Sequence, residues 1–198
     1  ATLRVLDQLA AEADTLTSGR VLIIHSGGDS RRVPHCSATG KLFARLPRVF
    51  PDGRASTVFD EFLIGLSGLS SAALPPGVLI ASGDVLLVFD HLQLSFRRGG
   101  VIGVAAAAPV EMGLRHGVYA AVSSAAVSSA AVPSAEYSGA EYSGAEYGAG
   151  YWRVRAYLHK PSAEELVRWN AVSDDGMVQI DTGLIWLAVA FTLAALVL

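Results

Sequence analysis

The stretch Val21-Leu22-Ile23-Ile24-His25-Ser26-Gly27-Gly28-Asp29-Ser30-Arg31-Arg32 joins an apolar run to a loop that contains glycine and arginine. Residues 21–25 form a short, mainly apolar run rich in β-branched side chains, which is typical of a buried strand. Gly27 and Gly28 carry no side chain to keep a phosphate from the backbone N–H groups, and Arg31 and Lys41 add positive charge. These residues predict a polyphosphate-binding loop at the carboxyl end of the first strand.

The spacing of this loop excludes two common phosphate-binding motifs. It lacks the Gly-x-x-x-x-Gly-Lys-Ser/Thr pattern of a Walker A loop and the Gly-x-Gly-x-x-Gly dinucleotide turn. A glycine turn with solvated arginines is the ordinary alternative for Gly27-Gly28 alone. Four polar motifs further along the chain favour phosphate binding: Ser82-Gly83-Asp84, Arg115-His116-Gly117-Val118, His159-Lys160-Pro161-Ser162 and Ile180-Asp181-Thr182-Gly183.

Each of these motifs offers a different group to a ligand. Asp84 follows a second buried strand, and a carboxylate in that place is an oxygen ligand of the kind Mg²⁺ prefers. His116 and Gly117 place a polar ring and a glycine just before a strand, where a ligand can approach closely. Lys160 follows another strand and can reach a sugar phosphate. Asp181 interrupts an apolar strand, which is costly unless the carboxylate is hydrogen-bonded.

The whole chain alternates between apolar strands and helical segments. We expect strands over 21–25, 78–81, 101–107, 117–122, 154–158 and 177–187, and helices over 1–14, 59–69 and 163–169. Ser162 and Glu165 form a capping-box pattern at the start of the last helix. This order predicts an α/β fold with a mainly parallel sheet and ligands at the carboxyl ends of its strands.

Composition limits the functions that the chain can have. Of 198 residues 52% are hydrophobic, which is enough for one globular core, and a net charge of −3 offers no broad basic surface for nucleic acid. The only lysines are Lys41 and Lys160, against 13 arginines, so they are the first candidates for a specific role. The single cysteine, Cys36, excludes a disulfide framework and fits a reducing compartment, and we expect the cytoplasm.

Two segments depart from this pattern. Residues 120–134 are three copies of a five-residue unit and further Ser-Gly-Ala-Glu-Tyr units follow, so 120–150 is predicted to be a low-complexity surface insertion. Residues 184–198 carry no charge, but a membrane span needs about 20 residues. We therefore expect a buried strand leading into a buried helix rather than a membrane anchor, and a domain truncated at its C-terminus.

The ordered motifs together carry a family resemblance. The stretch from His25 to Pro34, Gly40-Lys41 and the four motifs above resemble the GDP-fucose pyrophosphorylase domain of fucose-1-phosphate guanylyltransferases and L-fucokinases. The resemblance implies a partial nucleotidyltransferase domain over 1–198 with a Rossmann-like fold. It also implies transfer of guanylyl from GTP to fucose 1-phosphate with Mg²⁺, giving GDP-fucose and pyrophosphate. Such an in-line transfer needs alignment and charge neutralisation rather than a protein nucleophile.

Matched motif by motif, the resemblance implies four overlapping groups of site residues. Those for the nucleotide are Gly27, Gly28, Asp29, Arg31, Lys41 and Asp84. Those for the sugar phosphate are His116, Gly117, Lys160, Asp181, Thr182 and Gly183. Mg²⁺ would be held by Asp84 and Asp181, and the residues expected to act in catalysis are Arg31, Lys41 and Lys160.

Two alternatives to this function remain open on the sequence. The chain could be the N-terminal portion of an L-fucokinase or of a bifunctional fucokinase/pyrophosphorylase, with a covalently linked GHMP kinase domain in the parent chain. Nothing in residues 1–198 resembles that kinase domain. The chain could instead be a nucleotide-binding module without turnover.

Overall fold

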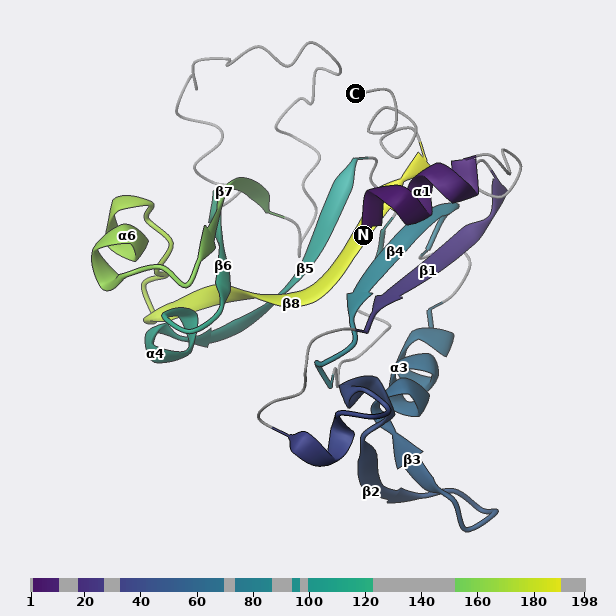
Figure 1. The fold of residues 1–198 in the computed structure, drawn as a ribbon. Helices are drawn as coiled ribbons and strands as arrows, with labels where there is room; N and C mark the ends of the chain where they lie inside the picture. Colours follow the sequence, from purple (N-terminus) through teal and green to yellow (C-terminus); the bar gives the residue numbers. More distant parts are fainter. Residues whose placement is uncertain are drawn as a thin grey trace. The chain divides into compact units, whose positions relative to one another are not determined.

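The structure is a computed structural model that describes residues 2–10, 18–26, 33–69, 74–86, 94–96, 100–122 and 152–189. It divides into two compact units, unit 1 from Ala1–Val104 and Thr182–Leu198 and unit 2 from Ala105–Asp181. The fold is mixed α/β (Figure 1). The main sheet is mostly antiparallel, with one parallel pair among its described strands.

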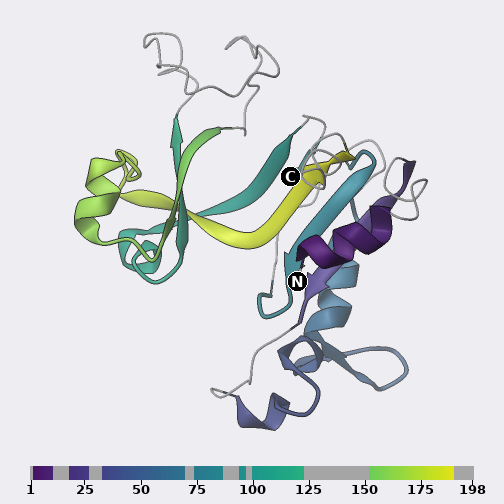
Figure 2. The ribbon, with the colours of Figure 1, turned by 45° about the horizontal axis from the view of Figure 1, so that its top comes forward.

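Unit 1 is built on the parallel pair of strands β1 (Arg20–His25) and β4 (Gly77–Ser82). Their register runs from Arg20 opposite Gly77 to His25 opposite Ser82, so the two carboxyl ends lie side by side. Helix α1 (Thr2–Ala10) lies along this pair in both ribbon views (Figures 1 and 2). Its Leu6 is buried against Ile23 and Val78, which fixes the helix on the strands through apolar contact.

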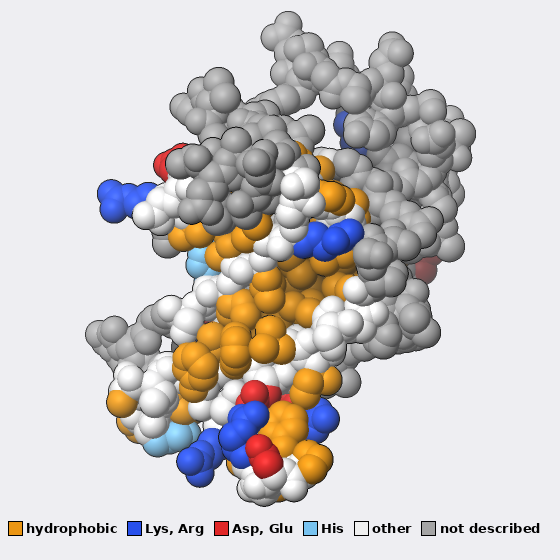
Figure 3. Space-filling model, turned by 90° about the vertical axis from the view of Figure 1, so that its right-hand side faces the viewer, with side chains coloured by type: hydrophobic (Ala, Val, Ile, Leu, Met, Phe, Trp, Pro, Cys, Tyr) orange, Lys and Arg blue, Asp and Glu red, His pale blue; other side chains and the backbone are white. Residues whose placement is uncertain are grey.

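A small hairpin and a helix precede β4 in unit 1. Strands β2 (Arg45–Val49) and β3 (Ala55–Thr57) pair antiparallel, and helix α3 (Val58–Ser67) follows directly. Thr57 and Asp60 form a reciprocal capping box at the start of α3. Figure 3 shows charged side chains of both signs gathered at the bottom of that view, where the hairpin lies. Arg48 pairs with Glu61 at 2.9 Å, and Arg54 pairs with Asp60 at 2.8 Å.

Two long strands, β5 (Val101–Pro109) and β8 (Met177–Ala188), pair with each other and contribute residues to both units. In unit 1, β8 pairs antiparallel with β4, from Gly77 opposite Ala188 to Ala81 opposite Leu184. The core of this unit joins these strands to α3 and to the 3-10 turn η2 (Lys41–Phe43). Its buried side chains are Leu42, Phe62, Leu79, Ala81, Phe96, Leu184 and Trp186.

Unit 2 is an antiparallel arrangement of β6 (Gly117–Val122), β7 (Arg153–His159) and the first part of β8. The short helices α4 (Val110–Gly113) and α6 (Ala163–Arg168) complete it. Its core lies on one face of the strands and consists of Val118, Ala120, Leu158, Leu166, Ala171 and Val178. The predicted capping box of α6 is confirmed, because Glu165 N donates to Ser162 Oγ and Ser162 N donates to the Glu165 carboxylate.

The expectation of a mainly parallel sheet is wrong. Only β1 and β4 are parallel among the described pairs for which the direction is defined, and the helix α3 lies between them in the chain. Parallel neighbours need such a crossover connection. Helix α6 also joins two strands, but β7 and β8 are not neighbours, because β6 lies between them. Alternation of helices and strands along the chain therefore did not determine which strands pair.

The positions of the predicted strands are otherwise close to the observed ones, and the hairpin β2–β3 was not predicted. The helix expected over 1–14 is described over Thr2–Ala10, and that over 59–69 is α3. The predicted insertion begins inside β6, and the rest of 120–150 lies outside the described residues. Residues 184–188 belong to β8, while 190–198 are not described. In the described part of the chain, no helix is long and apolar enough to cross a membrane.

Candidate functional site

A cavity of about 230 Å³ lies at the carboxyl ends of β1 and β4. Its walls come from the end of β1, the turn after β4 and the first residues of η2, and its lining residues are His25, Ser26, Lys41, Leu42, Ser82, Gly83 and Asp84. Cavities that enclose a whole drug-sized ligand are typically about 300–1,000 Å³. This one is therefore suited to part of a larger ligand, such as a phosphate group.

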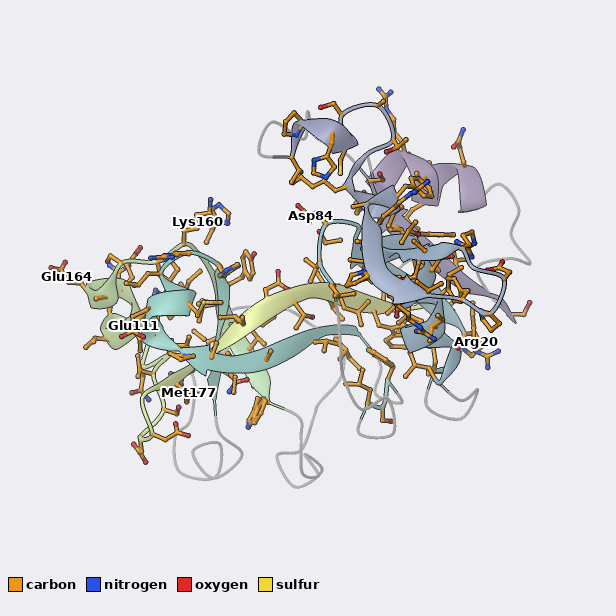
Figure 4. All side chains as sticks on the ribbon, turned by 90° about the horizontal axis from the view of Figure 1, so that it is seen from below. Arg20, Asp84, Glu111, Lys160, Glu164 and Met177 are labelled. Carbon is orange, nitrogen blue, oxygen red and sulfur yellow. The ribbon has the colours of Figure 1, made fainter. Side chains whose placement is uncertain are left out.

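Three polar side chains of this cavity form one network. Lys41 Nζ donates to Asp84 Oδ2 at 3.4 Å, and Ser82 Oγ donates to Asp84 Oδ1 at 2.7 Å. The side chain of Lys41 is 34% exposed and that of Asp84 50% exposed, so a ligand can reach both charges. Figure 4 labels Asp84 in the turn after β4. The two residues chosen from the sequence as phosphate and metal ligands are thus brought together, although 43 positions separate them.

The network keeps Asp84 ionised. The hydrogen bond from Ser82 lowers the pKa of Asp84, and the bond and charge of Lys41 lower it further, while partial burial acts in the opposite direction. An ionised carboxylate beside an ammonium group offers one ligand for a cation and one for an anion. Such a pair suits a substrate that carries both phosphate groups and a bound divalent ion.

Glycines allow the backbone to close around this cavity. Gly83 N donates to His25 O at 2.8 Å, and a Cβ at position 83 would lie only 2.6 Å from that same carbonyl oxygen. Gly183 has φ +73°, and a Cβ there would lie 2.7 Å from Ser82 Cβ. Because backbone and a short side chain cannot move far aside, both positions exclude larger residues. Gly183 therefore has a packing reason to be glycine, besides any part in sugar binding.

The cation is placed by a short anchored turn. Lys41 begins η2, and the next residue, Leu42, is buried in the core of unit 1. Gly40, which precedes the turn with φ +77°, allows the chain to enter it from the left-handed region. The apolar burial of Leu42 thus fixes the backbone from which Lys41 reaches Asp84.

A second polar cluster lies in unit 2, around Asp181 of β8. Tyr119 Oη donates to Asp181 Oδ1 at 2.9 Å, and Tyr157 Oη donates to Asp181 Oδ2 at 3.2 Å. Burial raises the pKa of both tyrosines, and the Asp181 carboxylate raises them further. Both phenols are therefore protonated at neutral pH and act as donors. The two hydrogen bonds give the Asp181 carboxylate partners within an otherwise apolar strand, as the sequence leads us to expect.

The remaining predicted sugar-phosphate residues of unit 2 meet where β6 begins and β7 ends. Gly117 pairs with His159, and Lys160 N donates to His116 O at 3.1 Å. Lys160 is exposed and has φ +48°, an uncommon conformation for a residue other than glycine. Its side chain is labelled in Figure 4. Arg115 and His116 are also exposed, which makes this end of the unit basic.

Other predicted residues stand apart from these two clusters or outside the described chain. Gly27, Gly28, Asp29 and Arg31 lie outside the described residues. Thr182 is described, and its Oγ1 donates to Val104 O at 2.7 Å, a bond within unit 1. The roles that the resemblance implies for all these residues stay predictions.

The donor set for Mg²⁺ is small. Among the described residues no group of three or more His, Cys, Asp or Glu side chains gathers in one place. Mg²⁺ commonly keeps several waters and takes only one or two carboxylates together with substrate phosphates. A single exposed and ionised carboxylate, Asp84, fits that kind of site, so the residues present are compatible with a metal that arrives with a nucleotide.

Comparison with known proteins places the chain in a family. A family model described as the fucose pyrophosphorylase domain matches residues 13–197. The chain belongs to the fucose pyrophosphorylase family. The matched range includes Lys41, Asp84, Lys160 and Asp181. No solved structure matches the chain.

Curated relatives of this fucose pyrophosphorylase domain are longer proteins. A bifunctional fucokinase/GDP-fucose pyrophosphorylase of Arabidopsis thaliana is 30% identical over 174 residues, which are 86% of this chain and 15% of the relative. Fucose-1-phosphate guanylyltransferases of Mus musculus and Homo sapiens are 29% and 26% identical over 80% and 82% of this chain. The chain spans 15% to 24% of the length of these relatives.

Reasoning from the sequence missed several residues of these clusters. Ser82 stood in a quoted motif without a role, although a serine two positions before an aspartate can donate to it in a turn. His25, which ends the predicted strand over 21–25, has no role in the sequence-based site but lines the cavity. Tyr119 and Tyr157 were not singled out. The sequence signal for these two residues is a hydroxyl-bearing side chain between apolar positions of a strand. Their contact with Asp181, however, depends on how the strands pair.

Proposed function

We propose that this chain carries the guanylyl-transfer chemistry of a GDP-fucose pyrophosphorylase, with GTP and fucose 1-phosphate as substrates. The observation that carries the proposal is the Lys41–Asp84 pair in the cavity at the ends of β1 and β4. The family match and the names of the relatives support fucose 1-phosphate and GTP as the substrates. The parallel pair joined through α3 supports a Rossmann-like nucleotidyltransferase fold as part of the proposal.

The reaction is an in-line displacement at the α-phosphorus of GTP. A phosphate oxygen of fucose 1-phosphate forms the new P–O bond, the bond from the α-phosphorus to the α–β bridging oxygen breaks, and its electron pair leaves with pyrophosphate. Both partners are anionic, so the protein must neutralise charge and hold the groups in line. Lys41 has three N–H donors and can contact a phosphate oxygen while it donates to Asp84.

Asp84 carries a negative charge, opposite to that of Lys41. This charge repels a triphosphate unless a cation lies between them. Mg²⁺ held by Asp84 would remove this repulsion and neutralise charge on the phosphates. Asp181, which the resemblance also implies as a metal ligand, is proposed here to bind the sugar. Lys160, with His116 and Gly117, is proposed to bind the phosphate of fucose 1-phosphate.

Pyrophosphate release from GTP and fucose 1-phosphate with Mg²⁺ tests this function. We expect release that requires both substrates, with kcat/KM lowered about 100-fold in Lys41→Met and in Asp84→Asn, because each change removes a charge from the phosphate site. Lys41→Arg should retain only part of the activity, since the planar guanidinium does not replace a compact ammonium on a short turn.

The matched control is Arg48→Met, which removes an exposed cation paired with Glu61 at 2.9 Å in the same unit. It should leave kcat/KM within about twofold, because exposed ion pairs contribute little. GTP binding without pyrophosphate release, in a folded chain, would instead indicate a nucleotide-binding module. Equal losses in Lys41→Met and Arg48→Met would contradict a specific role for Lys41.

A further inference from the structure

The described tyrosines of unit 2 and Asp181 lie on one face of its strands. Tyr119 and Tyr157 are directly opposite each other in the pairing of β6 with β7. Val118 pairs with Ile180, so the residues that follow them, Tyr119 and Asp181, point to the same side. The other side carries the apolar core that includes Val118. The three polar side chains are thus gathered on the face away from the core.

The two phenols hold the carboxylate from both ends. Each carboxylate oxygen of Asp181 accepts a hydrogen bond from one phenol, at 2.9 Å from Tyr119 and at 3.2 Å from Tyr157. The centroids of the two tyrosine rings lie 5.6 Å apart. Two donors on two different oxygens fix the plane of a carboxylate, which a single donor does not. A carboxylate oxygen can accept more than one hydrogen bond, so these phenols do not by themselves block a ligand hydroxyl.

Position 117 is part of the same construction. The ring of Tyr157 lies over Gly117, where a Cβ would come within 2.6 Å of Tyr157 Cζ. A larger residue at 117 would therefore push the ring aside. Tyr157 is nevertheless 51% exposed, so apolar burial alone does not explain why its hydroxyl points at Asp181. The hydrogen bond to the carboxylate gives that reason.

We propose that Tyr119 and Tyr157 are positioning residues, which hold the Asp181 carboxylate in the orientation that receives the sugar of fucose 1-phosphate. This inference rests on the proposed function, because that function makes Asp181 a substrate ligand. It adds two residues from other strands to the sugar site. It also predicts that the effect is selective for one substrate. The phenols act on fucose 1-phosphate through Asp181 and have no part in binding GTP.

The test compares the full 198-residue chain with Tyr119→Phe and Tyr157→Phe, which keep the rings and remove only the hydroxyls. We expect each variant to raise the KM for fucose 1-phosphate about fivefold to thirtyfold and to leave the KM for GTP within about twofold. Binding of fucose 1-phosphate alone, measured by titration calorimetry, should weaken by the same factor. In an Asp181→Asn background the phenylalanine changes should have much smaller effects, since they act through Asp181.

Ser173→Ala is the matched control. It removes another hydroxyl that donates to a carboxylate in unit 2, that of Asp175 at 2.5 Å. We expect it to change neither KM by more than about twofold, even where it lowers thermal stability. If a tyrosine variant loses stability as this control does but shows no selective change in fucose 1-phosphate binding, the role of that tyrosine is only structural.

The outcomes separate this inference from the proposed function. If the wild type transfers guanylyl and the tyrosine variants change both KM values equally or neither, the inference fails and the function stands. If the wild type transfers no guanylyl group, the binding of fucose 1-phosphate tests the inference. Fucose 1-phosphate binding that is weakened by Tyr119→Phe supports the inference, and a wild type that does not bind fucose 1-phosphate overturns it.

Discussion

Position 83 shows how one residue sets the shape of the cavity at the ends of β1 and β4. Gly83 is buried in the turn that links β4 to Asp84, and its N–H donates to the last carbonyl of β1, His25 O. That bond joins the ends of the two parallel strands and leaves no room for a side chain, because a Cβ would lie 2.6 Å from His25 O. The position of Asp84 therefore depends on glycine one residue earlier.

Gly83→Ala should destabilise the protein by about 2–4 kcal/mol, because either the backbone of β1 or the turn must move. Gly53→Ala is the matched control. It has φ +82° but nothing within 4 Å of a Cβ, so only backbone strain of about 1 kcal/mol is expected. Urea unfolding of both variants measures the difference. A smaller loss in Gly83→Ala than in Gly53→Ala would contradict the close packing at position 83.

Single residues of the site could be predicted to different extents. Lys41 and Asp84, which the sequence predicts to serve one ligand, lie within hydrogen-bond distance of each other, and their roles as ligands stay predictions. Tyr119 and Tyr157 could not be chosen, because their meeting depends on the pairing of β6 with β7, and about 30 residues separate those strands. Local sequence patterns carry no information on such a pairing.

At the scale of an element, the hairpin β2–β3 and helix α3 form a charged corner of unit 1. Asp60 accepts hydrogen bonds from Arg54 Nη1 at 2.8 Å and from Thr57 N and Oγ1, both at 2.8 Å. The Arg54 bond, followed by that of Thr57, lowers the pKa of Asp60 to about 2. One carboxylate thus joins the turn of the hairpin to the capping box of the helix.

Arg54→Met should raise the pKa of Asp60 from about 2 toward its ordinary value of 3.8. Because the folded pKa is the lower one, ionised Asp60 stabilises the fold fully above pH 3.8, and this contribution is lost as the pH falls toward 2. The variant should therefore show a weaker dependence of unfolding free energy on pH in that window. Carboxyl-carbon NMR titration gives the pKa directly.

Arg48→Met provides the comparison, because it breaks the neighbouring pair with Glu61 and leaves the Arg54–Asp60 bonds in place. It should leave the pKa of Asp60 near 2. The same pKa for Asp60 in wild type and in Arg54→Met would show that the capping box alone accounts for the lowering.

The sequence predicted where strands lie better than how they pair. The residues of β1, β4, β6 and β7 were found to within one or two positions, because apolar runs bounded by polar turns are local features. The hairpin β2–β3 was missed although Pro51-Asp52-Gly53 is a turn pattern, since Pro47 interrupts its first strand. The parallel sheet was wrong because strand order depends on contacts between distant segments.

At the scale of the whole molecule, the repeat region has its own test. Val122 pairs with Arg153, so the two ends of the segment 123–152 lie beside each other. Replacing 123–152 by Asn-Gly, which suits a two-residue hairpin, should leave the unit folded. The shorter connection should raise its stability by on the order of 1–2 kcal/mol. Thermal unfolding checks this, and loss of the folded state would contradict the prediction of a dispensable insertion.

Each unit has its own cluster of polar side chains. In unit 1 these are Lys41 and Asp84 in the cavity, and in unit 2 they are Asp181 with Tyr119 and Tyr157. The proposed function assigns the first cluster to the nucleotide and the second to the sugar. The chain spans 15% to 24% of the relatives' length, and one of these relatives is a bifunctional fucokinase/GDP-fucose pyrophosphorylase.

The most direct measurement follows two labels from GTP in the presence of fucose 1-phosphate and Mg²⁺. The account predicts that an α-phosphate label appears in GDP-fucose and a γ-phosphate label in pyrophosphate, with the rate of both lowered about 100-fold in Lys41→Met and retained in Arg48→Met. A γ-label transferred to the sugar phosphate, or an α-label that stays in GTP although GTP and fucose 1-phosphate both bind the folded chain, would contradict guanylyl transfer.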